Sequence, residues 1–146
     1  MSGVETGKKM LFIGENGAGK TALMEALSGK RSATRRPMAV EYCGRFVNTP
    51  GEFLENRRFY PAIITTSADC DVVVMVQDAT RINSLFPPQF ASLFTRRVVG
   101  VVSKVQMAGA NADRAIRFLK SAGAREIVLW NSDTGEGLER LQAMLQ

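Results

Sequence analysis

The sequence predicts an α/β fold in which a mainly parallel sheet carries helices on both faces. Val-rich runs of strand length alternate with helical stretches along the chain, an alternation typical of parallel sheets that are buried on both faces. A glycine-rich loop follows the first apolar run and precedes the first helical stretch. The 146 residues, 45% hydrophobic and 23% charged, are enough for one globular domain with a substantial core. We expect a single domain over residues 1–146, with a flexible N-terminus over 1–8.

The first half of the chain predicts three strands and two helices. A helix over 20–28 should stop at Gly29, because glycine readily takes the left-handed conformation that ends helices. A later helix contains Pro61, which should kink or split it. In order, we expect a strand over 8–13, the helix over 20–28, a basic loop over 30–37, strands over 38–42 and 45–48 joined by a tight Cys43-Gly44 turn, and a helix over 52–68.

The second half predicts three further strands, and the first two of them should be buried. In order, we expect a strand over 71–77, a loop with a short helix over 80–94, a strand over 98–103, a helix over 110–122 ended by Gly123, a strand over 126–130 and a helix over 137–145. An early hairpin followed by parallel strands gives six strands with one antiparallel edge strand. This order is that of a small Ras-like G domain, one class of P-loop NTPase.

The glycine-rich loop matches G-x-x-x-x-G-K-[ST], the Walker A or P-loop pattern, at every fixed position. In such a loop the backbone N–H groups turn inward and hold phosphate oxygens at the start of a helix. The lysine reaches the β- and γ-phosphates, and the following hydroxyl ligates Mg²⁺. The predicted phosphate-binding residues are Gly14, Glu15, Asn16, Gly17, Ala18, Gly19, Lys20 and Thr21.

A second part of the predicted site follows the strand over 45–48. In phosphoryl-transfer switches a carboxylate there holds Mg²⁺, usually through water, and a glycine three residues later contacts the γ-phosphate. Gly51 is in place, but Asn48 stands where the carboxylate is expected. An amide can orient a water but brings no negative charge to the cation, so we expect weak Mg²⁺ coupling. Read without its spacing from the P-loop, Thr49-Pro50-Gly51 is equally well an ordinary turn.

Base recognition in G domains uses a lysine whose stem lies against the base, and an aspartate two residues later. Here Ser103 and Lys104 are followed by Gln106 in the aspartate position. An amide cannot accept from both guanine donors as a carboxylate does, so guanine preference should weaken by ~1.5–3 kcal/mol. Adenine stays open as an alternative. The turn at Asn131 and Ser132 either presents a backbone N–H to the base or caps the last helix.

Charge and composition limit the other classes of function. The net charge is +5, with basic pairs such as Arg35/Arg36 and Arg96/Arg97. We interpret these as solvated loop charges and expect no nucleic-acid partner, because no aromatic residues interleave with them. There is no histidine, which removes histidine-based acid–base chemistry and histidine metal sites. Cys43 and Cys70 lack metal spacing and predict reduced thiols in a cytoplasmic protein. No apolar run approaches the ~20 residues of a membrane span.

Nearly the whole chain resembles the EutP/PduV family, small Ras-like P-loop proteins encoded with the bacterial microcompartments for ethanolamine and propanediol utilisation. The resemblance implies GTP/GDP or ATP/ADP as ligand, Mg²⁺ as cofactor, and docking to microcompartment shell or enzyme proteins. The family usually has Asp, Thr and Asp where this chain has Asn48, Pro37 and Gln106. Thr34 could replace the missing threonine. The pieces that carry the resemblance are 17–21, 38–41, 49–56, 64–66, 71–72, 103–104 and 131–132.

Hydrolysis would need a positioned water as well as a bound γ-phosphate. Glu52 follows Gly51 and could hold or activate that water, although an acidic residue there also complements a helix dipole. Lys20 completes the predicted catalytic pair. Asn16 places a side chain beside the γ-phosphate, where an incoming arginine would need room, so we expect slow intrinsic turnover. Three functions stay open: a nucleotide-dependent switch with weak GTPase or NTPase activity, a nucleotide-binding adaptor without hydrolysis, and a kinase for a short carboxylic acid.

Overall fold

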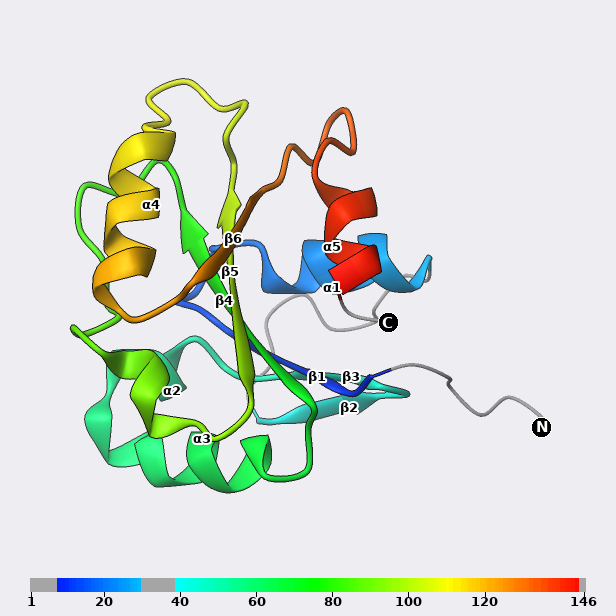
Figure 1. Ribbon diagram of the computed structural model, residues 1–146, viewed down its shortest axis with the longest axis vertical. Helices are drawn as coiled ribbons and strands as arrows, with labels where there is room; N and C mark the ends of the chain where they lie inside the picture. Colours follow the sequence, from blue (N-terminus) through cyan, green and yellow to red (C-terminus); the bar gives the residue numbers. More distant parts are fainter. Residues whose placement is uncertain (1–7, 30–38, 145–146) are drawn as a thin grey trace.

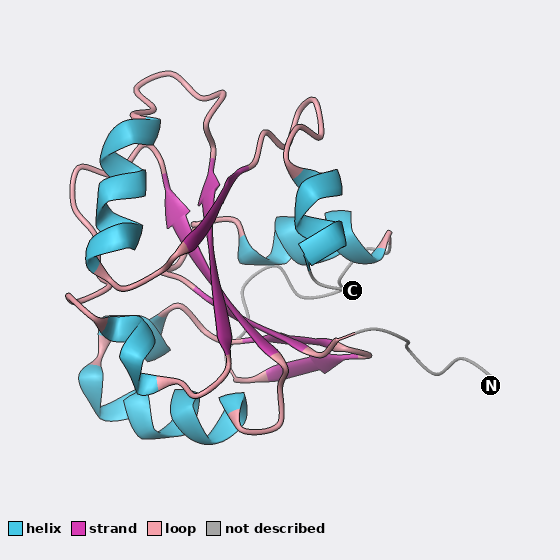
Figure 2. Cartoon of the chain, viewed as in Figure 1, coloured by secondary structure: helices cyan, strands magenta, loops and turns pink. Residues whose placement is uncertain are grey.

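The structure, a computed structural model, describes residues 8–29 and 39–144. Its centre is a six-stranded sheet with strand order β2-β3-β1-β4-β5-β6 (Figure 2). Only β2 runs antiparallel to its neighbour, and it lies at the edge. The strands are β1 (Met10–Ile13), β2 (Glu41–Cys43), β3 (Phe46–Asn48), β4 (Val72–Asp78), β5 (Arg97–Ser103) and β6 (Glu126–Leu129). This is the predicted α/β fold of P-loop NTPases.

Helices cover both faces of the sheet (Figure 1). On one face, α1 and α5 pack together over a buried cluster that includes Phe12 and Leu23. The other face is covered by α2, α3 and α4 over a second cluster that includes Ile63 and Leu119. The helices are α1 (Lys20–Ser28), α2 (Glu52–Glu55), α3 (Tyr60–Ser67), α4 (Ala112–Ser121) and α5 (Leu138–Met144), with 3₁₀ turns η1 (Arg57–Phe59) and η2 (Phe90–Leu93).

The helix predicted over 52–68 is the main correction. It divides into α2, η1 and α3, and the break lies at Asn56, whose extended φ of −127° ends α2. The Asn56 side chain then accepts a hydrogen bond from the Arg58 amide and caps the next turn. Pro61 lies in the first turn of α3, where a missing N–H costs nothing. Proline therefore starts the last segment and does not cause the break.

Other predicted boundaries shift by a few residues. The hairpin turn is at Gly44-Arg45, and its first strand begins at Glu41 instead of residue 38. Gly29 ends α1 with a φ of 74°, as predicted. Both cysteines are free, Cys43 exposed and Cys70 buried. Among the described residues, no helix is long and apolar enough to cross a membrane. The predicted flexible start and the basic loop over 30–37, with Thr34 and Pro37, lie outside the described residues.

Candidate phosphate-binding site

The P-loop joins the end of β1 to the start of α1, at the carboxyl ends of the parallel strands. Two of its glycines are required by geometry. Gly19 has a φ of 104°, which other residues rarely adopt. A Cβ on Gly14 would lie 2.8 Å from the Val76 carbonyl oxygen of β4. The loop therefore lies tightly against the sheet and leads directly into α1, whose first amides have no partner within the helix.

Lys20 is buried beneath this loop, with 6% of its surface exposed. Its Nζ donates to the carbonyl oxygens of Gly14 at 2.7 Å and Glu15 at 3.1 Å. Burial lowers the pKa of Lys20 to about 8, while the charges of Glu55 and Glu15 act to raise it. An ammonium has three N–H donors, so a third donor is available to an oxygen of a bound anion.

Asn48 lies at the end of β3 and is fully buried. Its Nδ2 donates to the Thr21 Oγ1 at 3.1 Å, so the two residues predicted to serve a metal are together. The Asn48 Oδ1 has no hydrogen-bond partner among the described residues, and such a buried acceptor is costly. A water on a cation would satisfy it. Within the described ranges no group of three acidic, Cys or His residues could hold a metal.

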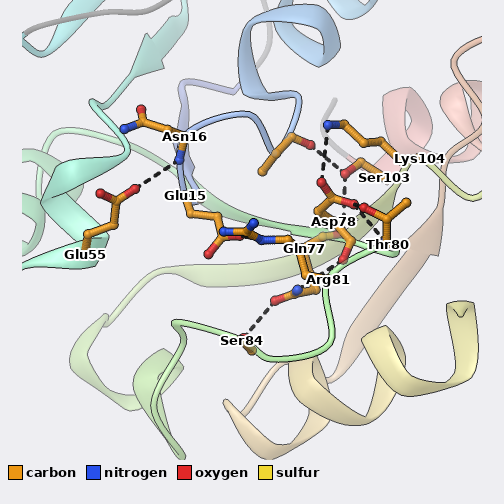
Figure 3. Close-up of polar contacts among 12 residues, drawn as sticks. Glu15, Asn16, Glu55, Gln77, Asp78, Thr80, Arg81, Ser84, Ser103 and Lys104 are labelled. Carbon is orange, nitrogen blue, oxygen red and sulfur yellow. Dashed lines mark hydrogen bonds and ion pairs between the residues drawn. The ribbon is translucent and has the colours of Figure 1, made fainter. Parts of the chain in front are cut away.

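Gly51 and α2 close one side of the loop. A Cβ on Gly51 would lie 2.3 Å from the Asn16 amide nitrogen, so glycine is needed here for close approach. From the end of α2, Glu55 Oε2 accepts a hydrogen bond from the same amide at 3.3 Å (Figure 3). Glu52 is exposed in the first turn of α2, beside Gly51. Gly51 and Glu55 therefore contact Asn16, whereas the predicted role of Glu52 stays a prediction.

Ser103 and Lys104, predicted for the base, make contacts with the sheet and the P-loop. The Ser103 hydroxyl donates to the Ala18 carbonyl oxygen at 2.6 Å, which fixes the loop to the end of β5. Lys104 Nζ pairs with Asp78 Oδ2 at 3.2 Å (Figure 3). Burial would raise the pKa of Asp78, but hydrogen bonds from Thr80 and Lys104 outweigh it and lower that pKa. Asp78 is thus an anion that holds the lysine.

The remaining base-site residues lie in two neighbouring loops. Gln106 Nε2 donates to the Ser132 Oγ at 2.9 Å, which joins the loop after β5 to the loop after β6. The Gln106 Oε1 has no partner among the described residues. Asn131 Oδ1 accepts from the amides of Asp133 and Thr134, so its side chain shapes its own loop. The base contacts themselves stay a prediction.

Sequence reasoning missed four residues at this site: Glu55, Asp78, Arg81 and Trp130. Asp78 had a signal, since a carboxylate that ends a buried Val strand lies at the edge where such sites form. Glu55 belonged to the 49–56 stretch but was given no role. Arg81 pairs with the nearly buried Glu15 of the P-loop (Figure 3), and nothing in its spacing indicated this. The Trp130 ring would lie 3.8 Å from a Cβ on Gly19.

Known proteins are similar to this chain over most of its length. A family model for ethanolamine and propanediol utilisation proteins, PduV-EutP, matches residues 7–146. The chain belongs to the EutP/PduV family. The propanediol utilisation protein PduV of Citrobacter freundii is 27% identical over 92% of this chain and 90% of its own. Proteins named "Probable acetate kinase EutP" are 37% identical in Salmonella typhimurium and 34% in Escherichia coli, over 82% of this chain and 76% of theirs.

Proposed function

We propose that this member of the EutP/PduV family binds a nucleotide, GTP/GDP or ATP/ADP, through its phosphates. The observation that carries the proposal is the buried Lys20 ammonium beneath a complete P-loop. Burying a lone ammonium is costly unless carbonyls or anions surround it. Here two carbonyls hold the ammonium of the motif lysine, the residue that reaches the β- and γ-phosphates in P-loop proteins. An anion bound to the amides at the start of α1 would complete its surroundings.

Mg²⁺ is the cofactor that the donor set fits best. Thr21 would hold it directly and Asn48 through a water, using the unpartnered Oδ1. The cation would neutralise charge between the β- and γ-phosphates. Both protein donors are neutral oxygens, which Mg²⁺ accepts but binds less strongly than carboxylates. Nucleotide binding should therefore depend only modestly on the metal.

The proposed reaction is slow NTP hydrolysis, accessory to ethanolamine or propanediol-type metabolism. Lys20 would stabilise the transferred phosphoryl group and Glu52 would hold the attacking water. Glu52 is exposed, so the water it holds would be loosely positioned. The family supports the metabolic setting, and a location in the cytoplasm at a bacterial microcompartment, with shell or enzyme proteins as partners, follows from it as a proposal.

A second candidate is a kinase for a short carboxylic acid. Three relatives are named as probable acetate kinases, and Arg81 places a guanidinium, half exposed, beside the P-loop. Arginine binds carboxylates through two parallel hydrogen bonds, so Arg81 could hold an acceptor acid. A third candidate is an adaptor that binds nucleotide without turnover, which the neutral Asn48 and Gln106 favour.

One assay separates the three candidates. The purified chain is incubated with GTP or ATP and Mg²⁺, with and without acetate or propionate. Phosphate release that needs no acceptor supports the NTPase. Nucleoside diphosphate formation that needs the acid supports the kinase, and Arg81→Ala should then weaken acid dependence. Tight binding without turnover supports the adaptor. If neither triphosphate binds up to millimolar concentration, the proposal of a nucleotide site is wrong.

A further inference from the structure

A carboxylate of the protein itself, that of Glu55, is hydrogen-bonded to a backbone amide of the P-loop. Glu55 is an exposed residue at the end of α2, and its carboxylate accepts from the Asn16 amide, 39 residues away in sequence. The backbone of α2 supports this contact, because Gly51 at the start of α2 lies against the same Asn16 amide. Figure 3 shows Glu55 reaching Asn16 from one side of the loop. The short helix therefore holds a negative charge against the P-loop.

In a P-loop the backbone amides cradle the α- and β-phosphates, and the lysine reaches the β- and γ-phosphates. The charge of Glu55 acts on that lysine, Lys20, and its carboxylate accepts from Asn16, the third residue of the motif, so a γ-phosphate beside Lys20 would meet this charge. The charge of Glu55 raises the pKa of Lys20 more than the charge of Glu15 does. One carboxylate thus engages both an amide and, through space, the ammonium that a γ-phosphate would use.

We infer that Glu55 sets the selectivity of the site between nucleoside diphosphates and triphosphates, and favours the diphosphate. The inference rests on the proposed nucleotide site. A γ-phosphate beside Lys20 would meet the like charge of the Glu55 carboxylate, and like charges repel. A bound diphosphate would leave the hydrogen bond from the Asn16 amide to the Glu55 carboxylate intact. A triphosphate must first displace the carboxylate into solvent, which its exposed position allows at a moderate cost.

The test compares affinities for GDP and GTP, and for ADP and ATP, with imido triphosphate analogues to exclude hydrolysis. Trp130 is the single tryptophan of the chain and lies against Gly19, so its fluorescence can report binding. Glu55→Gln keeps an oxygen for the Asn16 amide and removes the charge. The control is Glu139→Gln, which replaces an exposed carboxylate on α5 and makes the same change in net charge.

We expect Glu55→Gln to tighten triphosphate binding about tenfold and to leave diphosphate binding nearly unchanged. Glu139→Gln should alter neither ratio. Glu55→Ala, with its melting temperature compared to that of the unmodified chain, should shift the ratio in the same direction. If Glu55→Gln affects both ligands equally or neither, the inference is wrong and the nucleotide site stands.

Two other outcomes overturn the inference in distinct ways. If Glu55→Gln weakens triphosphate binding only when Mg²⁺ is present, Glu55 serves the metal and does not oppose the phosphate. If the unmodified chain binds neither diphosphate nor triphosphate, the proposed nucleotide site fails and the inference fails with it.

Discussion

The two ends of the candidate site are built differently. At the phosphate end, Lys20, Thr21 and Asn48 are buried and linked to one another or to the loop backbone. At the base end, Gln106 and Ser132 come from two loops and are joined by one hydrogen bond between half-buried and exposed side chains. The first end is preformed by the packing of β1, β3 and α1. The second depends on loops.

This difference separates affinity from selectivity. The proposed phosphate binding would use backbone amides and one charge, and both are fixed by the fold. Base choice would depend on side chains at loop positions, where Gln106 stands in place of the aspartate expected to favour guanine. We therefore expect the chain to bind nucleotides through their phosphates and to discriminate weakly between bases.

Removal of the Lys20 ammonium should have the largest effect on the phosphate end of the candidate site. Lys20→Ala should weaken nucleotide binding by about 2–5 kcal/mol, roughly 30-fold or more, because a buried charged partner is lost. The measurement is calorimetric titration with GTP, GDP, ATP and ADP. Lys120→Ala, in the last turn of α4, is the control and should bind normally. Unchanged affinity in Lys20→Ala would remove the basis for every other role assigned here.

The predicted weak base selectivity can be tested by placing a carboxylate at position 106. Gln106→Asp should raise the preference for GTP over ATP by ~1.5–3 kcal/mol, about tenfold to a hundredfold, since guanine offers two donors to one carboxylate. Competition titration of the two nucleotides measures it. Met107→Asp adds the same charge to the same loop at a half-exposed position and should leave the ratio unchanged. A shift in both variants would indicate only a general electrostatic effect.

The same division explains what the sequence could predict. The order of strands, the bounds of α1 and the meeting of Asn48 with Thr21 followed from hydrophobic runs and from a motif with fixed spacing. The split at Asn56 did not, because no proline or glycine marks it in the sequence. An extended Asn56 makes the break and caps the next turn with its side chain. The contacts of Glu55 and Arg81 with the P-loop join residues 39 and 66 positions apart. Side-chain pairs across such separations leave no periodic signal.

Asn48→Asp tests the metal side of the phosphate end. The carboxylate would accept from the Thr21 hydroxyl and attract Mg²⁺, so removal of Mg²⁺ should weaken nucleotide binding about tenfold more in this variant than in the unmodified chain. Titrations with Mg²⁺ and with a chelator give the comparison. Asn83→Asp, exposed in the loop after β4, is the matched control. Equal Mg²⁺ dependence in all three proteins would contradict the assignment of Asn48.

The pH dependence of binding tests the same ammonium without any substitution. Burial holds the pKa of the free Lys20 at about 8, against the opposing charges of Glu55 and Glu15. Bound phosphates add negative charge and raise that pKa, so above pH 8 binding must take up a proton. Affinity should be highest below pH 8 and fall as pH rises, by at most about tenfold per pH unit. The phosphate itself titrates near pH 6 and does not contribute there.

Titrations from pH 7 to pH 9.5, repeated in buffers of different ionisation enthalpy, measure both the affinity and the proton uptake. Glu55→Gln provides the internal comparison. It removes the larger of the two charges that raise the pKa of Lys20, so its decline in affinity should begin at lower pH than in the unmodified chain. A pH-independent affinity in both proteins would mean that the ammonium keeps its proton without phosphate. In that case the carbonyls of Gly14 and Glu15, and not a bound anion, fully compensate its burial.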